Sequence, residues 1–450
     1  MTVTSPPPIA SWTKPSDIYT LTIEKGSNRY GLEGGFIQFD YFESIFSPHI
    51  SGNLVIADTG FGVEQGALIS ALQITGNEKI RVLINHPSGS LDFDDDIHHF
   101  IVDSIKDLGS NENTKITSFR VVSKYEKKNK ITAVEGAYDN NIRNSFQDIL
   151  TNKLGVPTNK LNLENTQNAL SFKGSGRTPF DIGLFLAPRS RPVSGAPGFV
   201  FYESKDGFNF VALNSLIAGG VVGHYTSKGV SAGGENQHSS CRIIKYKYIK
   251  RPDVGEMEGS GLFRSQAKYF NPLSQEVTTN IFNMSDQSFV FDSLGSESFA
   301  DQYNLLDQEY PSSIYSIDNS SLPTTYGFFD TGNNGVAPLA GISTACNDII
   351  QAINNDPRLY QAMAIMRYHS LMTEVIDMVI PCNIFLKAGH VIECEFKKIA
   401  GNITSASPND EWQSGKYLIM HLSHRFTQNG DMGSTTHLRV ARDTRGMYSP

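Results

Sequence analysis

Three runs of residues near the C-terminus decide the fold, because their apolar positions follow the patterns of β-strands. They are HVIECEF (His390–Phe396), KYLIMHLSH (Lys416–His424) and THLRVA (Thr436–Ala441). A similar set lies in the first third of the chain: KIRVLI (Lys79–Ile84), HFIVDSI (His99–Ile105) and TSFRVV (Thr117–Val122). Both sets end on Thr-x-(Phe/Leu)-Arg-Val-(Val/Ala). This repetition predicts two copies of one small barrel-like β-unit.

Length and composition describe an ordinary globular chain. Its 450 residues suffice for two to four domains, with 39% hydrophobic residues and a mean hydropathy of −0.26. The 39 glycines, 27 phenylalanines and 18 tyrosines favour a fold rich in strands and loops. A net charge of −8 argues against a surface that binds nucleic acid, although not against a duct through which nucleic acid passes.

The cysteines and the N-terminus give no sign of export. Cys241, Cys346, Cys382 and Cys394 form no CxxC pair, so we expect neither a zinc site nor a disulfide framework, but reduced thiols in a protein assembled in the cytoplasm. The first residues lack the basic and apolar regions of a signal peptide. No uncharged apolar run approaches the ~18 residues of a membrane span.

The predicted fold class is α+β and predominantly β, with two β-barrel units, the second of them discontinuous, a small α+β domain between them and a loop-rich insert. We expect these parts to occupy an N-terminal arm (1–16), a first barrel (17–135), a middle domain (136–238), a second barrel (241–283 and 367–445) and the insert of loops and helices (284–366).

Local patterns predict individual elements. Alternation over Phe36–Phe42 places Ile37, Phe39 and Tyr41 on one face of a strand. The middle domain should hold a helix over 142–150, a helix capped by Thr178 before Pro179, and a hairpin of 199–203 with 208–211. Two more helices are expected over 345–354 and 357–372.

The segment most suggestive of chemistry is DFDDDIHH, Asp92–His99. Its carboxylates and histidines could hold a divalent cation, or could form a solvated acidic loop between two strands. On a strand, the adjacent His98 and His99 would point to opposite faces, and so would His421 and His424, three positions apart. We therefore predict no catalytic, cofactor-binding or metal-binding residues and no cofactor.

Other candidate motifs are incomplete. The run from Asp330 to Gly335 is similar to a calcium loop, but glycines occupy its third and twelfth positions, where oxygen ligands are needed. Gly174–Arg177 reads as a turn, because no phosphate-loop lysine follows it. We expect Lys124–Lys130 to form a solvated hairpin tip and Lys245–Lys250 to form a strand exposed on one face.

Several stretches in chain order resemble the central hub protein of contractile bacteriophage baseplates, and also the hub part of type VI secretion spike proteins. The stretches are Ile50–Asp58, Gly198–Phe210, Gly261–Leu273, Pro381–Ile392 and Gly415–His424. In that resemblance the two barrels are similar to tail-tube proteins. The insert at 284–340 has no counterpart in the resemblance.

The resemblance implies a homotrimer whose two barrels per chain form a ring of six similar units. Such a ring would join the hexameric tail tube, or a tube initiator, to a trimeric spike, beside baseplate wedge proteins. DNA would pass through its lumen without specific binding. The expected location is the virion tail baseplate, after assembly in the host cytoplasm and without membrane insertion, and the expected role is structural rather than enzymatic.

Two other classes of function stay open from the residues alone. A receptor- or glycan-binding tail protein would use exposed aromatic platforms, for which the only tryptophans are Trp12 and Trp412. A carbohydrate-active hydrolase would need two converging carboxylates. One sequence does not identify such a pair.

Overall fold

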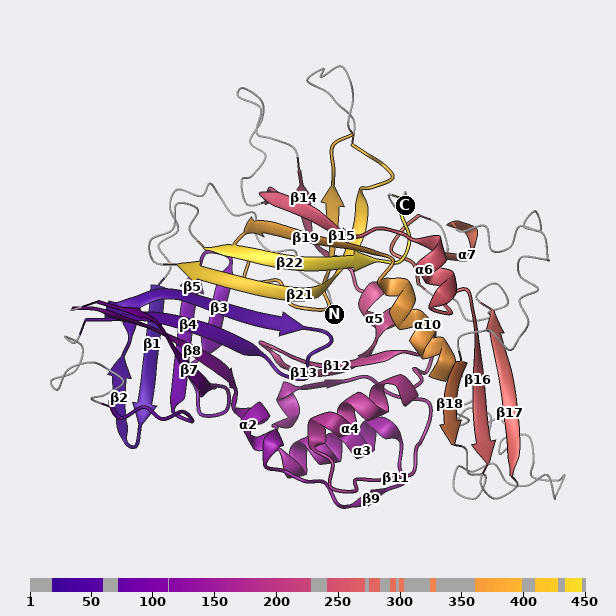
Figure 1. Cartoon of the computed structure of the whole chain (residues 1–450), viewed down its shortest axis with the longest axis horizontal. Coiled ribbons are helices and arrows are strands. Elements are labelled where there is room, and N and C mark those ends of the chain that lie inside the picture. The colour runs from indigo at the N-terminus through magenta and orange to yellow at the C-terminus, as the bar shows by residue number, and fades with distance from the viewer. Residues whose placement is uncertain are drawn as a thin grey trace.

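The computed structural model is predominantly β, as predicted (Figure 1). It describes residues 18–59, 72–111, 113–227, 241–271, 275–283, 292–296, 299–302, 324–328, 361–398, 409–427 and 434–446. The Asp330–Gly335 motif, Trp12, Cys346 and the helix expected over 345–354 lie outside these residues. Among the described helices, none is long and apolar enough to cross a bilayer.

One 14-stranded sheet runs through both predicted β-units. Its first unit contains β1 (Ile18–Lys25), β2 (Asn28–Gly31), β3 (Phe36–Ser44), β4 (Ser51–Asp58), β5 (Lys79–His86), β6 (Gly89–Phe93), β7 (Phe100–Ser110) and β8 (Lys115–Ser123). Its second unit contains β14 (Val221–Thr226), β15 (Lys245–Lys250), β19 (Glu374–Pro381), β20 (Val391–Glu395), β21 (Gly415–Thr427) and β22 (Thr435–Arg442). A continuous apolar core with members from both units lies against one face of this sheet.

The predicted duplication is confirmed by the strand pairing. The first unit contains the order β5-β7-β8-β4-β3, and the second contains β20-β21-β22-β19-β15. Arg120 of β8 and Arg439 of β22 occupy equivalent places, opposite Asn53 and Asp377 respectively. A β-bulge interrupts the register at the same point of both units, beside Val102 in one and beside Ile419 in the other. Shared order, register and bulge are much stronger evidence of repetition than similar strand patterns.

The bulge affects which side chains of the two long strands face the core. Phe100 lies two residues before Val102 in the first unit, and Tyr417 lies two residues before Ile419 in the second, so the two positions are equivalent. Both side chains are fully buried. The next inward positions, Val102 and Ile419, are also fully buried. A bulge changes which side chains face the core, so a strict two-residue alternation does not hold along either long strand.

The middle module folds largely as predicted. Its helices are α2 (Lys124–Lys130), α3 (Ile142–Asp148) with a π-helical turn (Ile149–Lys153), α4 (Pro179–Leu186) and α5 (Leu213–Ile217), and its strands are β9 (Ala137–Tyr138), β10 (Leu161–Leu163), β11 (Phe172–Lys173), β12 (Phe199–Ser204) and β13 (Gly207–Ala212). Thr178 Oγ1 accepts a hydrogen bond from the Asp181 backbone N–H at 3.2 Å, which confirms the predicted cap. Phe146, Phe201 and Phe210 join α3 to the β12–β13 hairpin in a separate aromatic core.

Two segments pair differently from expectation. We expected all of 241–283 to enter the second barrel, but only β15 does so. β16 (Arg264–Asn271) and β17 (Glu276–Asn283) pair with each other and with β18 (Thr324–Phe328) in a separate sheet. Ala267 and Tyr269 of β16 face a small core with helix α10 (Gln361–Leu371), so this hairpin buries its apolar face away from the main sheet. In turn, β14 from the expected middle domain pairs with β20. The exact domain limits stay a prediction.

Two local expectations were wrong for identifiable reasons. A bulge between Phe36 and Gln38 turns Ile37 outward, to 36% exposure, while Phe39 and Tyr41 are fully buried. Lys124–Lys130 is the helix α2 rather than a hairpin tip. Ser123 accepts a hydrogen bond from the Glu126 backbone N–H at 3.4 Å, and Ser-x-x-Glu is the capping-box pattern that starts a helix.

A buried ion pair fastens α10 to the end of the second unit. Arg367 and Asp443 side chains are 1% and 0% exposed, and Arg367 Nη1 lies 2.9 Å from Asp443 Oδ2. Arg367 Nε also donates to Asn214 Oδ1 at 3.0 Å. These contacts join α10, the segment after β22 and the middle module.

We predict that Arg367→Met lowers the free energy of unfolding by about 3–5 kcal/mol, because Asp443 would stay buried without its cation. Chemical denaturation measures this change. The matched control is Arg439→Met, which removes another arginine–aspartate pair whose side chains are 43% and 39% exposed. That control should cost less than about 1 kcal/mol. Equal costs for the two variants would contradict the role assigned to burial.

Candidate functional site: an inter-unit junction, two strand edges and a basic groove

The two units are joined along strands β3 and β21. Seven residue pairs run from His421 opposite Ser44 to Thr427 opposite Gln38. Arg425 Nε lies 2.8 Å from Asp40 Oδ1 across this junction, and the Asp40 side chain is only 7% exposed. On the other face, Phe426 stacks against Phe39 with ring centroids 6.4 Å apart. The junction therefore has both ladder pairing and side-chain contacts on each face.

Glu43 of β3 ties three parts of the chain together beneath this junction. Its Oε1 accepts hydrogen bonds from the Tyr41 hydroxyl and the Lys205 backbone N–H, both at 2.7 Å, and its Oε2 accepts one from the Ala388 backbone N–H at 2.8 Å. Lys205 lies in the β12–β13 turn, and Ala388 lies between β19 and β20. Burial raises the pKa of Glu43, while these hydrogen bonds oppose the rise.

Glu203 of β12 is a second buried carboxylate at the contact between the middle module and the first unit. Its Oε2 accepts a hydrogen bond from the Ile50 backbone N–H at 3.0 Å. Its Oε1 lies 3.9 Å from His98 Nε2, and both of these atoms are buried without a hydrogen-bond partner. Burial raises the pKa of Glu203 to about 8 and lowers that of His98 to about 3. Near neutral pH the two groups therefore face each other mainly uncharged.

Each unit has one strand edge that pairs with no other described strand. In the repeat, β15 corresponds to β3, and β7 corresponds to β21. However, β15 is paired only with β19, and β7 beyond Val102 is paired only with β8, within the described part of the chain. The edges equivalent to the two sides of the β3–β21 junction are thus both without a partner strand among the described residues.

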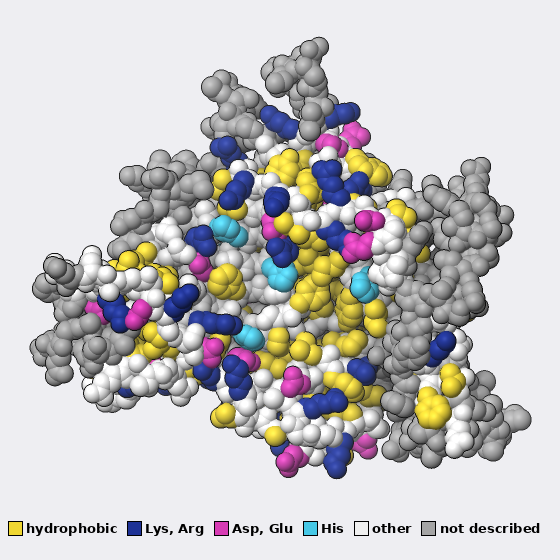
Figure 2. All heavy atoms as spheres, viewed as in Figure 1, with side chains coloured by type: hydrophobic (Ala, Val, Ile, Leu, Met, Phe, Trp, Pro, Cys, Tyr) yellow, Lys and Arg dark blue, Asp and Glu magenta, His cyan; other side chains and the backbone are white. Residues whose placement is uncertain are grey.

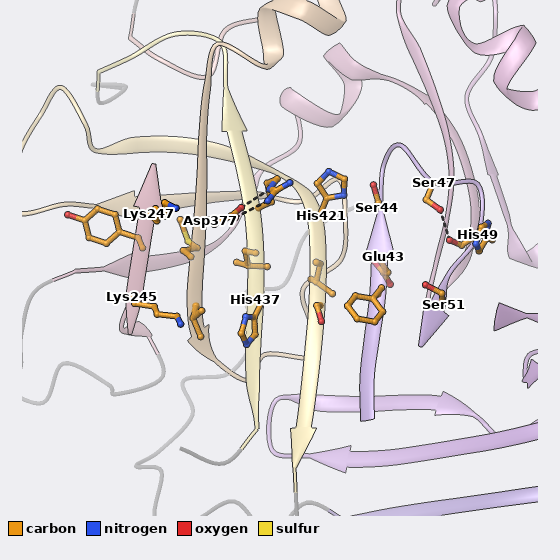
Figure 3. A pocket seen from close by; sticks show the side chains of 18 residues that line it. Glu43, Ser44, Ser47, His49, Ser51, Lys245, Lys247, Asp377, His421 and His437 are labelled. Atoms are coloured by element: carbon orange, nitrogen blue, oxygen red, sulfur yellow. Dashed lines mark hydrogen bonds and ion pairs between the residues drawn. The ribbon is translucent and has the colours of Figure 1, made fainter. Parts of the chain in front are cut away.

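A groove of about 690 Å³ lies on the sheet face opposite the main core (Figure 3). It is lined by residues of six neighbouring strands, from β15 through β19, β22, β21 and β3 to β4, so the sheet is hollowed on this face. Lys245 and Lys247 of β15 project into it, and neither makes an ion pair with a described residue. The predicted strand is present as β15, and Tyr248 packs against the main core. The alternation holds only in part, because Tyr246 is 41% exposed and a bulge lies between Tyr248 and Lys250.

The other polar groups of the groove carry little net charge. Arg439 Nε lies 2.7 Å from Asp377 Oδ1, so this pair is neutral overall. Burial lowers the pKa of His421 and of His437, which keeps both rings mainly neutral at pH 7. The two lysines therefore give the groove a positive charge although the whole chain has a net charge of −8. Figure 2 shows basic side chains over these strands, interspersed with histidines.

The segment Asp92–His99 was predicted to be either a cation site or a solvated loop. Two of its aspartates form ion pairs with arginines. Asp94 binds Arg29, and Asp96 Oδ1 lies 2.5 Å from Arg81 Nη2. Asp95 accepts a hydrogen bond from the His98 backbone N–H. In the part of the chain that the structure describes, no group of three or more histidine, cysteine, aspartate or glutamate residues is placed to hold a metal ion.

The remaining candidates have structural places. His424 is fully buried and His421 faces the groove, so the predicted separation of this pair is confirmed. Gly174–Arg177 is a turn, closed by a hydrogen bond from Arg177 N–H to the Gly174 carbonyl at 3.0 Å. Cys382 and Cys394 are buried free thiols, whereas Cys241 is exposed. Trp412 is 49% exposed, and its carbonyl accepts a hydrogen bond from buried Arg442.

Sequence reasoning missed both buried carboxylates, although a signal was present. Phe39, Tyr41 and Glu43 alternate on one strand face, and Phe199, Phe201 and Glu203 do the same. In each case a glutamate ends a row of inward aromatic residues. A charged residue in such a position needs hydrogen-bond partners, and therefore marks a contact between elements.

Comparison with known proteins supports the resemblance at the level of the fold. No protein-family model matches the chain, and no curated protein matches it in sequence. A tail protein from Neisseria meningitidis is 9% identical, with a TM-score of 0.51, over 94% of this chain and 97% of that protein. A prophage 43 kDa tail protein from Shewanella oneidensis is 9% identical, with a TM-score of 0.50, over 95% and 99%.

These similarities extend along nearly the whole length of both tail proteins. The chain therefore has the fold of these two tail proteins, and the predominantly β fold class predicted from the sequence is confirmed.

We predict that Glu203→Gln changes the pH dependence of stability. Because the folded-state pKa of Glu203 is raised to about 8, the wild-type carboxyl stabilises the fold below its unfolded pKa of about 4.3, and this contribution is lost as the pH rises toward 8. The glutamine variant cannot lose a proton. Its stability relative to wild type should therefore increase between pH 5 and 8 by an amount on the order of a few kcal/mol.

Urea denaturation at several pH values measures this difference. Glu393→Gln is the control, because its partner His224 is 73% exposed. A difference between wild type and Glu203→Gln that does not change with pH would contradict the prediction.

Proposed function

We propose that the chain is the structural hub of a phage tail baseplate and acts without catalytic turnover. In this proposal it forms a homotrimer whose six β-units make a pseudo-sixfold ring. One side of the ring binds the hexameric tail tube or its initiator, the other binds a trimeric spike, and wedge proteins lie around it. The ring leaves a channel for DNA. The protein would be assembled in the host cytoplasm and reside in the virion.

The proposal rests on the pairing of β3 with β21 inside the chain, and on the two equivalent strand edges to which no described strand is paired. β3 of the first unit pairs with β21 of the second, while β15 and the part of β7 beyond Val102, their equivalents, each have one edge that no described strand pairs with. Pairing β15 of one copy with β7 of the next would repeat the internal junction between chains. The two edges belong to different surfaces, so the contact is heterologous and generates a ring if the rotation closes.

The geometry of the sheet supports a channel inside this ring. The sheet is hollowed on the face opposite its core, and this hollow spans the junction between the units. If the same curvature continues through successive junctions, the hollowed face turns toward the axis and the apolar cores lie outside it. Closing the ring would also cover two unpaired strand edges, which otherwise favour uncontrolled association.

We predict that the purified protein forms a trimer. Mass photometry or light scattering with size exclusion should give three times the chain mass of 49.6 kDa. A protein that stays monomeric at high concentration, alone and with its spike partner, would contradict the hub proposal. A stable dimer would also contradict it, because two copies provide four units rather than six.

The repeat further predicts which residues meet between chains. Asp40 pairs with Arg425 in the internal junction. The equivalent of Asp40 on β15 is Lys247, since their partners Asn53 and Asp377 are equivalent, and the equivalent of Arg425 on β7 is Gly109, opposite Ile116. Directly opposed strand residues have Cα separations of about 4.5–5.5 Å, within the range that a disulfide bridges.

We therefore expect Lys247→Cys/Gly109→Cys to form intermolecular disulfides under mild oxidation. Denaturing, non-reducing electrophoresis should show dimers and trimers that disappear on reduction. The substitutions are made in a Cys241→Ser background, because Cys241 is the exposed native thiol among the described cysteines. Each single cysteine variant is a control and should give no trimer. A double variant that forms trimers in solution but no cross-link would contradict the proposed register.

A further inference from the structure

The groove at the junction has a charge that the proposed hub role does not require. Lys245 and Lys247 line it, both with exposed side chains. Two acidic residues also line it: Asp377 is bound to Arg439, and the buried Glu43 carboxylate accepts hydrogen bonds from Tyr41, Lys205 and Ala388. Ser44, Ser51 and Ser423 add hydroxyl donors. A concave surface with unpaired ammonium groups and hydroxyl groups favours an anionic occupant.

The positive charge belongs to the second unit and is not a common property of the repeat. At the positions equivalent to Lys245 and Lys247, the first unit has Gln38 and Asp40. Asp40 is itself paired with Arg425, and Gln38 donates a hydrogen bond to Asp40 at 2.6 Å. Strand pairing between chains in the proposed ring does not require the two units to differ in charge at these positions. The lysines therefore call for an explanation beyond the ring itself.

We propose that this groove contacts the phosphate backbone of double-stranded DNA in the channel, through Lys245 and Lys247 of each chain. The inference rests on the proposed hub function. It adds to the channel three basic sectors, each formed by the groove lysines of one chain. Contacts to phosphates carry no sequence information, so they hold a duplex without selecting its sequence. Because exposed ion contacts exchange rapidly and weaken with salt, such sectors can steady DNA that still moves.

The pairing of the floor strands favours DNA over an acidic peptide. β19, β22, β21 and β3 are each paired on both sides, so the floor offers no free strand edge. Peptides that bind sheets gain much of their affinity by adding a strand to such an edge. A duplex needs only cations and hydroxyl donors directed toward its phosphates, and these are the groups that the groove presents.

The test uses the full-length protein whose oligomeric state has been measured, with a fluorescent DNA duplex in anisotropy titrations at pH 8. His421 and His437 are neutral there, because burial lowers their pKa, so the lysines carry the free charge. Lys245→Gln/Lys247→Gln should weaken binding at least tenfold at low salt. If all six lysines of a ring contact phosphates, the slope of log affinity against log salt should fall by about 5.

The matched control is Lys153→Gln/Lys173→Gln, which removes the same charge from exposed positions of the middle module and should leave binding unchanged. A wild-type trimer that does not bind DNA, or binds equally after the groove lysines are replaced, would overturn this inference and leave the hub proposal intact. Polyglutamate binding as tightly as DNA would overturn the assignment to nucleic acid. A monomer that binds DNA through these lysines would retain the groove contact and overturn the ring.

Discussion

The carboxylate of Glu43 is the contact on which the arrangement of the whole chain depends. It is buried, and its two oxygens accept hydrogen bonds from β3 itself, from the β12–β13 turn and from the loop before β20. A buried carboxylate is costly unless such donors surround it, so the three parts must meet in one geometry to satisfy it. Neighbouring contacts reinforce this geometry. Lys387 lies 2.6 Å from Asp206, and Glu203 binds the backbone of Ile50. The hairpin thus orients both units from beneath their common junction.

The repeated pattern Thr-x-(Phe/Leu)-Arg-Val was enough to predict the duplication. A register shift of one residue would turn every inward side chain outward, so both units must keep the same register. Arg120 and Arg439 therefore keep equivalent places although the surrounding sequences differ. Features that depend on tertiary partners were less accessible. Ile37 faces outward because of a bulge, and β16 and β17 pair with β18 rather than with the main sheet. The sequence patterns predicted strands here, but such a pattern does not specify which sheet edge a strand joins.

The candidate site was likewise predictable from the sequence only where it depends on local patterns. The pattern of Lys245–Lys250 predicted a strand exposed on one face, and Lys245 and Lys247 of this strand line the groove. The groove itself requires residues from β3, β15, β19, β21 and β22, which lie far apart in the sequence. The acidic segment at Asp92–His99 attracted attention because its charges are adjacent in sequence. In the fold these charges are paired with Arg29 and Arg81. Net charge describes the whole chain, and an acidic chain can still carry a local basic surface.

Backbone repetition and side-chain difference together suit the proposed place between a hexameric and a trimeric partner. The two units share strand order, register and a bulge, so a ring of three chains could present a nearly sixfold backbone to a tube. Their side chains do not share that symmetry, since Lys247 stands where the first unit has Asp40. The added strands differ as well, because β1 runs antiparallel to β5 whereas β14 runs parallel to β20. A threefold partner could distinguish alternate units by these differences. On this argument, duplication followed by divergence of the two units is what allows one chain to match both symmetries.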